Sequence, residues 1–315
     1  MFSILNDLKA KAIDKFKNES DIKKFLDNLV RFNQYSYNNQ LLIYLQNPDA
    51  SYVASLRSFN QMGYRINAES KGLKIFIPNF YNLVKIKRTD NHTDIVPYFS
   101  LSEEEKNIYK DKNNDTITFY KQKLSGFSLG TVFDIKDTNM PIESIEEELN
   151  PKLDDARAGD IKDCLIKAIY NDNFKVRYDD ISGTTKGYCD MDNNTIVIRK
   201  GLNNLMQMKV LIHEYAHGLA HKHLKDNNME YVEHRNKYET EAESIAYVVS
   251  NYLGVKQGDD SLTYLYAWSK EKDFKEIDDS LNTIVNYSKK IINNYEKFYD
   301  REFGLYAEDM KTIKV

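Results

Sequence analysis

Residues 209–223 read KVLIHEYAHGLAHKH, and this stretch decides how the rest of the chain is interpreted. It contains the pattern H-E-x-x-H, formed by His213, Glu214 and His217. Two imidazoles four residues apart lie on one face of a helix, where they can bind a single zinc ion, and the Glu beside the first faces the metal-bound water. The chain has only six histidines, so its composition yields such a match by chance on the order of one time in a hundred. The pattern therefore predicts a metal-binding helix.

The residues around the motif favour a helix, because apolar side chains recur there at steps of three and four. These side chains are Leu205, Met208, Ile212, Tyr215 and Leu219. They predict a buried stripe with His213 and His217 on its flank. The alternative is an ordinary amphipathic helix that carries two histidines with no metal between them.

A metal site needs a third protein ligand, and spacing argues against two nearby histidines. His221 lies about 12 Å along a straight helix from His213, so the two cannot bind one ion. His223 stands where the pattern H-E-x-x-H-x-x-G-x-x-H has its third histidine. Ala220 occupies the glycine position of that pattern, and alanine continues a helix rather than turning the chain back. The third ligand is therefore expected further along the chain.

A second helix is predicted to begin near residue 238, in the stretch YETEAESIAYVV. Glu239 and Glu243 are four residues apart and stack on one helix face, whereas Glu241 points elsewhere. Two stacked carboxylates repel each other, so their presence indicates a nearby cation or a group that shares a proton with them. A solvated acidic helix start is the alternative for this pair.

These motifs carry a resemblance to a known family. The block IHEYAHGLAH, followed by YETEAESIAYVVSNYLG, is similar to the peptidase domain of ArdC-like antirestriction proteins, which are gluzincin-type relatives of the ImmA/IrrE family. The resemblance implies a Zn2+ cofactor bound by His213, His217 and Glu239. It also implies that Glu243 orients a ligand histidine and that Glu214 is the catalytic general base, which takes a proton from the attacking water.

Length and composition favour a globular protein of two domains. The chain has 315 residues, of which 29% are charged and 41% hydrophobic. No apolar run approaches the roughly eighteen residues of a spanning helix, and residues 1–20 lack the apolar core of a secretory signal. Cys164 and Cys189 have no paired spacing, which fits a reducing compartment. We therefore expect a cytoplasmic protein without a membrane partner.

The first part of the chain is basic although the whole chain carries a net charge of −4. Residues 1–88 hold 14 Lys and Arg against 7 Asp and Glu, whereas the remainder holds 30 against 41. Aromatic side chains interleave with these bases, a combination that suits single-stranded DNA but is also found on solvated helices whose aromatic rings belong to the core. The expected DNA contacts are Tyr37, Asn39, Phe59, Tyr64, Arg65, Lys71 and Lys74.

The stretches YSYNNQLLIYLQNPDASYV, KGLKIFIP and GTVFDIKDTNMP resemble the N-terminal single-stranded-DNA-binding domain of the same ArdC-like proteins. The family commonly has Trp at the position of Phe59, Arg at that of Tyr64, and a Lys-Gly-Glu turn at residues 68–70. These differences make the turn less basic than it is in the family. The resemblance implies DNA binding by the N-terminal part.

Periodicity and composition predict the order of elements. Two helices are expected between Ile22 and Leu45, a third near residues 51–62, and strands at residues 64–66 and 73–78. Residues 89–125 are interpreted as a polar insertion with a surface helix starting at the acidic run 103–105. In the second half, helices are expected at 161–170 and 273–299, strands at 175–178, 188–190 and 195–199, and a further element at 262–269. The last of these strands is expected to border the active-site cleft and to offer an edge to an extended peptide.

The fold predicted from these observations is α+β with two domains. Residues 1–141 would form the single-stranded-DNA-binding domain, 142–155 an acidic linker, and 156–315 a zincin-like metallopeptidase domain. The predicted function is that of a zinc metallopeptidase with an unknown protein substrate, and the family resemblance implies that it protects incoming mobile-element DNA from restriction. Two alternatives remain: a DNA-binding protein with a structural, inactive zinc site, and a protease that cleaves a DNA-binding regulator.

Overall fold

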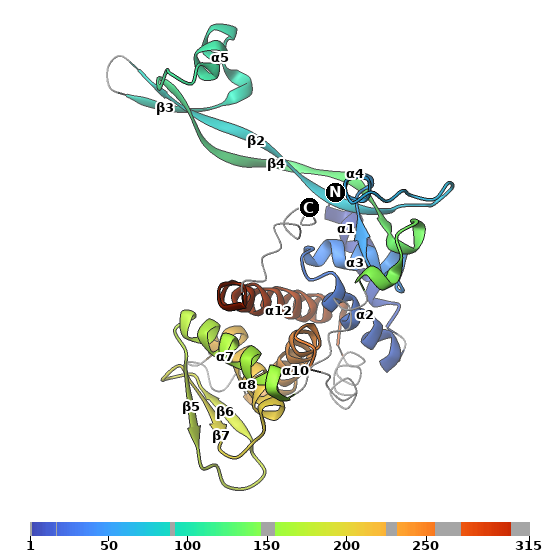
Figure 1. Cartoon of the computed structure of the whole chain (residues 1–315), viewed down its shortest axis with the longest axis vertical. Helices are drawn as coiled ribbons and strands as arrows, with labels where there is room; N and C mark the ends of the chain where they lie inside the picture. The colour runs from blue at the N-terminus through green and yellow to red at the C-terminus, as the bar shows by residue number, and fades with distance from the viewer. Residues whose placement is uncertain are drawn as a thin grey trace. The chain divides into compact units, whose positions relative to one another are not determined.

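The structure is a computed structural model, and it describes residues 2–16, 18–88, 92–145, 155–224, 232–255 and 272–303. Helices and sheets are both present, which confirms the α+β class (Figure 1). The chain forms two compact units: residues 1–73 with 132–315, and Lys74–Thr131. No helix among the described residues is both long enough and apolar enough to cross a bilayer.

The N-terminal segment is helical. Its elements are α1 (Phe2–Ile13), α2 (Glu19–Arg31), α3 (Tyr37–Gln46), β1 (Val53–Ala54) and α4 (Leu56–Gln61). Helices α2 and α3 are the two that the apolar periodicity predicts, whereas α1 was not predicted. Asn18 caps α2 by accepting a hydrogen bond from the backbone of Asp21, and Ser55 caps α4 in the same way. The cap at Ser55 makes the third helix shorter than predicted, because residues 51–54 are extended before it.

The unit Lys74–Thr131 is built on a long β-ribbon. Its elements are β2 (Leu73–Lys87), β3 (Thr93–Pro97), the 3-10 turn η1 (Tyr98–Ser100), α5 (Glu103–Lys110) and β4 (Ile117–Asp134). The sheet order is β1-β4-β2-β3, and Ser102 and Glu105 form a capping box at the start of α5. A small hydrophobic cluster packs under α5 and contains Val84, Ile86, Leu101 and Ile117.

One prediction about this region is wrong and another is confirmed in part. The strand expected at residues 64–66 is reduced to a single bridge between Ile66 and Thr138. The surface helix expected to start at the acidic run 103–105 is α5, which begins at Glu103, whereas β3 and the start of β4 in the same segment were not predicted. Periodicity missed these strands because few of their side chains are buried, so no alternation of apolar and polar residues marks them.

The second half of the chain packs helices beside a three-stranded sheet. Its elements are η2 (Ile135–Asp137), η3 (Ile142–Ile145), α7 (Asp155–Asn171), β5 (Lys175–Asp179), β6 (Gly187–Asp190), β7 (Thr195–Arg199), α8 (Asn204–Ala220), η4 (Lys222–Leu224), α10 (Arg235–Tyr252) and α12 (Phe274–Phe303). In α12, which matches the helix expected at residues 273–299, apolar side chains such as Ile284, Ile291 and Ile292 are buried. The element expected at 262–269 and most of the predicted linker lie outside the described residues.

The sheet order corrects one prediction. The order β5-β7-β6 makes β7 the central strand, paired in parallel with β5 and antiparallel with β6. A central strand has both of its backbone edges occupied, so residues 195–199 cannot offer an edge to a peptide. The edge strand on the other side of the antiparallel pair is β6, which packs against α8.

The helices before residue 73 and the helices after residue 155 share one hydrophobic cluster. Phe25 of α2 lies in the same cluster as Ile245 of α10 and Ile284 of α12. Polar contacts join the same elements: Tyr247 Oη donates to Asp27 at 2.8 Å. The predicted domains 1–141 and 156–315 therefore do not coincide with the compact units, and their boundaries stay a prediction based on sequence segments.

Candidate metal centre

Helix α8 holds the two histidines of the motif on the side of its buried face. Asn203 caps the helix by accepting a hydrogen bond from the backbone of Met206. The apolar side of α8 is fully buried and includes Met208, Leu211, Ile212, Tyr215 and Ala216. His213 and His217, one turn apart, therefore have a rigid support on a packed helix.

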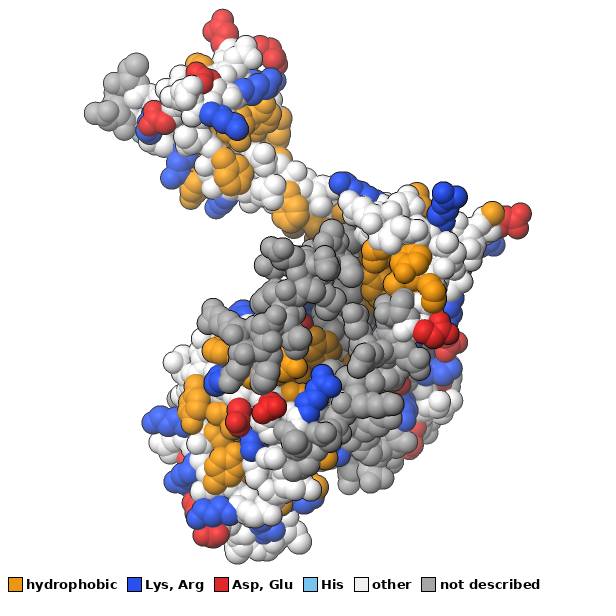
Figure 2. Space-filling model, in the orientation of Figure 1, with side chains coloured by type: hydrophobic (Ala, Val, Ile, Leu, Met, Phe, Trp, Pro, Cys, Tyr) orange, Lys and Arg blue, Asp and Glu red, His pale blue; other side chains and the backbone are white. Residues whose placement is uncertain are grey.

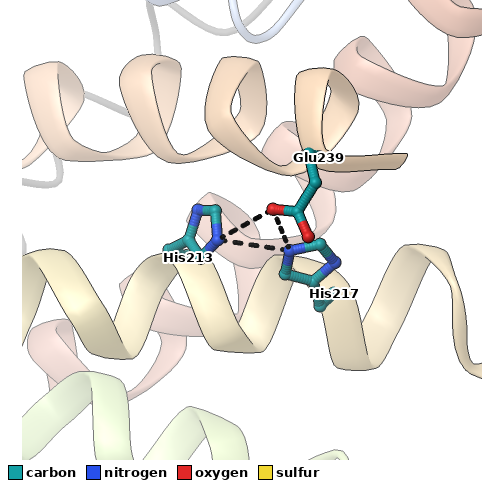
Figure 3. Close-up of side chains that lie close together, drawn as sticks. All are labelled: His213, His217 and Glu239. Carbon is teal, nitrogen blue, oxygen red and sulfur yellow. Dashed lines mark hydrogen bonds and ion pairs between the residues drawn. The ribbon is translucent and has the colours of Figure 1, made fainter. Parts of the chain in front are cut away.

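Three side chains converge on one point between α8 and α10 (Figure 3). The Nε2 atoms of His213 and His217 are 3.2 Å apart. Glu239 Oε2 lies 3.8 Å from the first of these atoms and 3.4 Å from the second. Two nitrogens that each lie about 2.0–2.1 Å from one tetrahedral zinc are about 3.3 Å apart. The three atoms are therefore spaced so that a single divalent ion could bind all of them.

The electrostatics of these groups also fit a cation. Burial, and repulsion from His217, lower the pKa of His213 to about 4. Hydrogen bonding to His217 and the nearby imidazoles lower the pKa of Glu239 to about 2. Neutral imidazole and ionised carboxylate are the forms that bind metals. A positive charge between the three atoms would also relieve the approach of three electron-rich groups.

Glu214 faces β6, beside the converging trio. Burial raises the pKa of Glu214 to about 7, and the carboxylates of Glu239 and Glu243 act in the same direction. Gly187 lets β6 come close to α8, because a Cβ at Gly187 would lie 2.4 Å from Val210 Cγ1 and 3.6 Å from Glu214 Cγ. A carboxylate whose pKa is near neutral beside a metal site can accept and return a proton.

The other two acidic residues of α10 face different ways, as their spacing predicts: Glu243 lies on the same face as Glu239, and Glu241 does not. Glu243 Oε1 lies 3.6 Å from His213 Nδ1, on the opposite side of that ring from Glu239. Glu241 is buried and does not reach the trio; its Oε2 lies 3.0 Å from His221 Nε2. This second contact could not be predicted from the sequence, because it depends on how α8 packs against α10.

Peptide hydrolysis also needs an oxyanion donor, and the sequence offers Tyr188 and His234 as candidates for it. Tyr188 is on the edge strand β6 and is 42% exposed, and His234 is the exposed N-cap residue of α10. Cys189 follows Tyr188 and is mostly buried; burial raises the pKa of its thiol to about 12, which fits a residue without a nucleophilic role. The roles of Tyr188 and His234 stay predictions.

Three of the predicted DNA contacts are buried, which corrects their assignment. Phe59 has no exposed surface, Tyr37 is 5% exposed and Asn39 is 7% exposed. Tyr37 instead donates a hydrogen bond to Asp278 at 2.7 Å. Side chains that belong to a packed core cannot stack on bases, so the aromatic pattern in this part of the sequence reports a core.

The remaining predicted contacts are accessible. Arg65, Lys71 and Lys74 are exposed and Tyr64 is half-buried. Lys74 donates a hydrogen bond to Thr131 across the ribbon at 2.7 Å. Among the predicted DNA contacts, the basic side chains are therefore accessible to a ligand, and most of the aromatic side chains are not.

Comparisons with known proteins agree with part of the sequence resemblance. Residues 2–133 match the family model of the N-terminal domain of the anti-restriction factor ArdC. An uncharacterized Bacillus anthracis protein, pXO2-81, is 25% identical over 302 residues, which are 90% of this chain and 49% of that protein. The chain thus spans about half the length of the curated relative it matches.

Two solved structures are also similar to the chain. They are the metal-free and the Mn(II)-bound crystal structures of antirestriction ArdC from plasmid R388, at 15% and 16% identity with TM-scores of 0.47 and 0.45. Each alignment covers 84% of this chain and 86% of the other. With scores and identities this low, these alignments assign neither a fold nor a metal to the chain. The match of the family model is specific to one segment: residues 2–133 are similar to ArdC N-terminal domains.

Proposed function

We propose that this chain is a zinc-dependent metallopeptidase. The observation that carries the proposal is the convergence of His213 Nε2, His217 Nε2 and Glu239 Oε2 within 3.8 Å of one another, with Glu214 beside them. Two imidazoles and one carboxylate are the protein ligands of many catalytic zinc sites, which keep a fourth position for water or substrate. A divalent ion bound there supplies Lewis-acid chemistry, which polarises a carbonyl and makes a water molecule more acidic.

The residues of the chain would then divide the work of peptide hydrolysis. Glu214 would accept a proton from the attacking water and return it to the leaving amine, a role that suits its raised pKa. The backbone edge of β6 lies on the side of α8 where Glu214 sits, so an extended peptide could add to it by backbone hydrogen bonds. Substrate orientation would thus depend on backbone contacts more than on side-chain pockets.

A structural zinc site is the main alternative, and the arrangement argues against it. Structural sites close the coordination shell with four protein ligands, whereas three converge here among the described residues. A structural site also has no need of Glu214, a buried carboxylate that costs stability when it ionises.

The test compares Glu214→Gln with wild type and with Glu233→Gln, a matched change at an exposed glutamate. Zinc content, thermal unfolding and the new N-termini produced in a proteome digest are measured for all three proteins. Glu214→Gln should keep its zinc and its fold and lose cleavage by roughly a hundredfold or more. Glu233→Gln should cleave like wild type. Equal cleavage by all three would contradict the proposal, and zinc loss in Glu214→Gln would mean that the ligand set is wrong.

We propose a second function, binding of single-stranded DNA, and place it on the β-ribbon of the unit Lys74–Thr131. Residues 74–88 and 117–131 contain six Lys and Arg and no Asp or Glu. The same strands carry exposed hydrophobic side chains, among them Phe80 (54%), Phe119 (52%) and Phe127 (44%). Figure 2 shows hydrophobic and basic side chains next to each other on this part of the surface.

Large exposed hydrophobic side chains usually mark a binding surface. Aromatic rings that stack on bases, together with cations that neutralise phosphates, are the common means of binding single strands without sequence preference. Lys85 Nζ lies 4.6 Å from the centroid of the Tyr120 ring, so cations and rings are already interleaved on the ribbon. Affinity of the full-length chain for labelled oligo-dT at low and high salt tests this function, and no binding at low salt would contradict it.

The two activities together suit protection of incoming mobile-element DNA from restriction, the role that the name of the matched family indicates. The alternative is cleavage of a DNA-binding regulator. A transformation assay with unmodified plasmid separates the two, because protection should disappear with Glu214→Gln only if cleavage is part of it.

A further inference from the structure

A chain of buried polar contacts leads away from the metal centre behind His217. His217 Nδ1 lies 3.2 Å from His221 Nδ1, and His221 Nε2 lies 3.0 Å from Glu241 Oε2. Ser280 Oγ donates to the other carboxylate oxygen, Glu241 Oε1, at 2.6 Å. The members come from the end of α8, from α10 and from α12, so the chain of contacts ties three helices together.

If His217 binds a metal through Nε2, only one placement of the ring hydrogens satisfies this series of contacts. His217 Nδ1 must then carry the ring hydrogen, so it donates to His221 Nδ1. His221 Nδ1 accepts and therefore has no hydrogen, which places the hydrogen of that ring on Nε2, where it is donated to Glu241. Glu241 accepts from His221 on one oxygen and from Ser280 on the other. Each hydrogen bond in this series of contacts therefore has one donor and one acceptor.

We propose that His221 and Glu241 are positioning residues for the metal centre: they fix the tautomer and the ring orientation of His217 so that its Nε2 lone pair faces Glu239. The proposal rests on the proposed metal site and names residues that the H-E-x-x-H motif does not include. Ligand histidines commonly donate their second ring N–H to a carboxylate or carbonyl group, and such partners tune metal affinity. Here the carboxylate acts through a second imidazole.

Burial and symmetry support a role beyond ordinary packing. The side chains of His221 and Glu241 are 1% and 4% exposed, so water does not compete for their hydrogen bonds. Lys237 Nζ lies 3.9 Å from Glu241 Oε1 and offsets the buried charge. On the other ligand, Glu243 stands 3.6 Å from His213 Nδ1. Each ligand histidine thus has an acidic residue of α10 behind it, one directly and one through His221.

The first test measures the zinc affinity of the full-length protein by competition with a chromophoric chelator. The variants are His221→Phe, which keeps a ring without nitrogens, and Glu241→Gln, which keeps the shape of the carboxylate. Each should bind zinc about 10- to 100-fold more weakly than wild type. His223→Ala is the matched control, because His223 is exposed two residues beyond His221, and it should bind like wild type. Folded His221→Phe with an affinity within about twofold of wild type would overturn the proposal.

The second test can be decided on the metal-free wild-type protein, so it requires neither a folded variant nor a bound metal. Nitrogen-15 NMR of the metal-free wild-type protein reports which ring nitrogen of each histidine carries the hydrogen. The proposal expects Nδ1–H for His217 and Nε2–H for His221, and an Nε2–H tautomer of His217 would overturn it. In Glu241→Gln the His217 signals should move even where the melting temperature does not, which a purely structural contact would not produce. If the wild-type protein bound no zinc, the metallopeptidase proposal would be wrong. The tautomers of His217 and His221 would still show whether His221 and Glu241 orient the His217 ring.

Discussion

The helical core around α8 and the ribbon formed by β2 and β4 use hydrophobic residues in opposite ways. In the core, apolar side chains such as Phe25, Ile212 and Ile245 have no exposed surface. On the ribbon, Phe80, Phe119 and Leu129 are more than half exposed. The core side chains stabilise the fold and support the helices that carry His213, His217 and Glu239, whereas the ribbon side chains contribute little to a core and are available to a partner. Residue type alone therefore does not reveal which role an aromatic side chain has.

Truncation of one aromatic ring in each region gives the largest expected contrast. Phe25 packs at ring-centroid distances of 5.2 Å against both Phe16 and Tyr44. Phe25→Ala should lower the free energy of unfolding by about 3–5 kcal/mol, because it leaves a cavity in a packed cluster. Phe127→Ala, at a side chain that is 44% exposed, should change it by about 0.5 kcal/mol or less. Urea unfolding followed by circular dichroism measures both, and similar losses would contradict the division between core and ribbon.

The metal centre permits the next contrast, between two stacked glutamates of α10. Glu239→Gln removes a ligand atom and should weaken zinc binding about a hundredfold, which is about 2.7 kcal/mol. Glu243→Gln removes only the carboxylate that faces His213 Nδ1, and it should weaken zinc binding about tenfold. Isothermal titration with zinc measures both, with Glu233→Gln as the control. Equal losses in the two variants would mean that Glu239 is not the third ligand.

The convergence of His213 and His217 at the candidate metal centre was predictable from the sequence because their spacing is local. His213 and His217 lie one helical turn apart, and a helix of regular pitch fixes their relation without knowledge of the rest of the fold. Glu239 was reached through its stacking with Glu243 and through the family resemblance, and the structure brings it to 3.4 Å from His217. The contact of His221 with Glu241 was not predictable, because it depends on the approach of separate helices.

The ribbon was hard to predict for a related reason. A strand is recognised by alternation of apolar and polar residues, which arises when one of its faces is buried. In the middle of β2 and β4 most side chains are exposed, so the alternation is absent. Tyr37 and Phe59 were assigned to DNA because residues 1–88 as a whole have an excess of bases, but both side chains lie inside a core in the structure.

The DNA proposal predicts that ribbon aromatics matter for binding while contributing little to stability. Phe80→Ala should weaken binding of single-stranded DNA by about 1–3 kcal/mol, because it removes a ring on which a base can stack. Tyr170→Ala is a matched control, since Tyr170 is 52% exposed but lies on α7, outside the ribbon. Fluorescence anisotropy with a labelled oligo-dT measures both affinities. Equal affinities of Phe80→Ala and wild type would remove stacking from the proposal and leave only charge.

The smallest expected effect concerns a single cation of the ribbon. Lys121 lies 5.2 Å from the centroid of the Tyr120 ring on β4, among the bases of a stretch that has no acidic residue. If Lys121 neutralises one phosphate, Lys121→Ala should reduce the slope of log Kd against log salt by about 0.7, the contribution of one released counterion on a single strand. The loss of affinity in Lys121→Ala should be the same for oligo-dT and for mixed sequences, because a phosphate contact does not distinguish one base from another. Lys200→Ala, at a surface lysine that pairs with Asp180 outside the ribbon, should leave the slope unchanged. A weaker affinity with an unaltered slope would show that Lys121 acts by supporting the Tyr120 ring, and equal slope changes in the two variants would mean that DNA contacts are not confined to the ribbon.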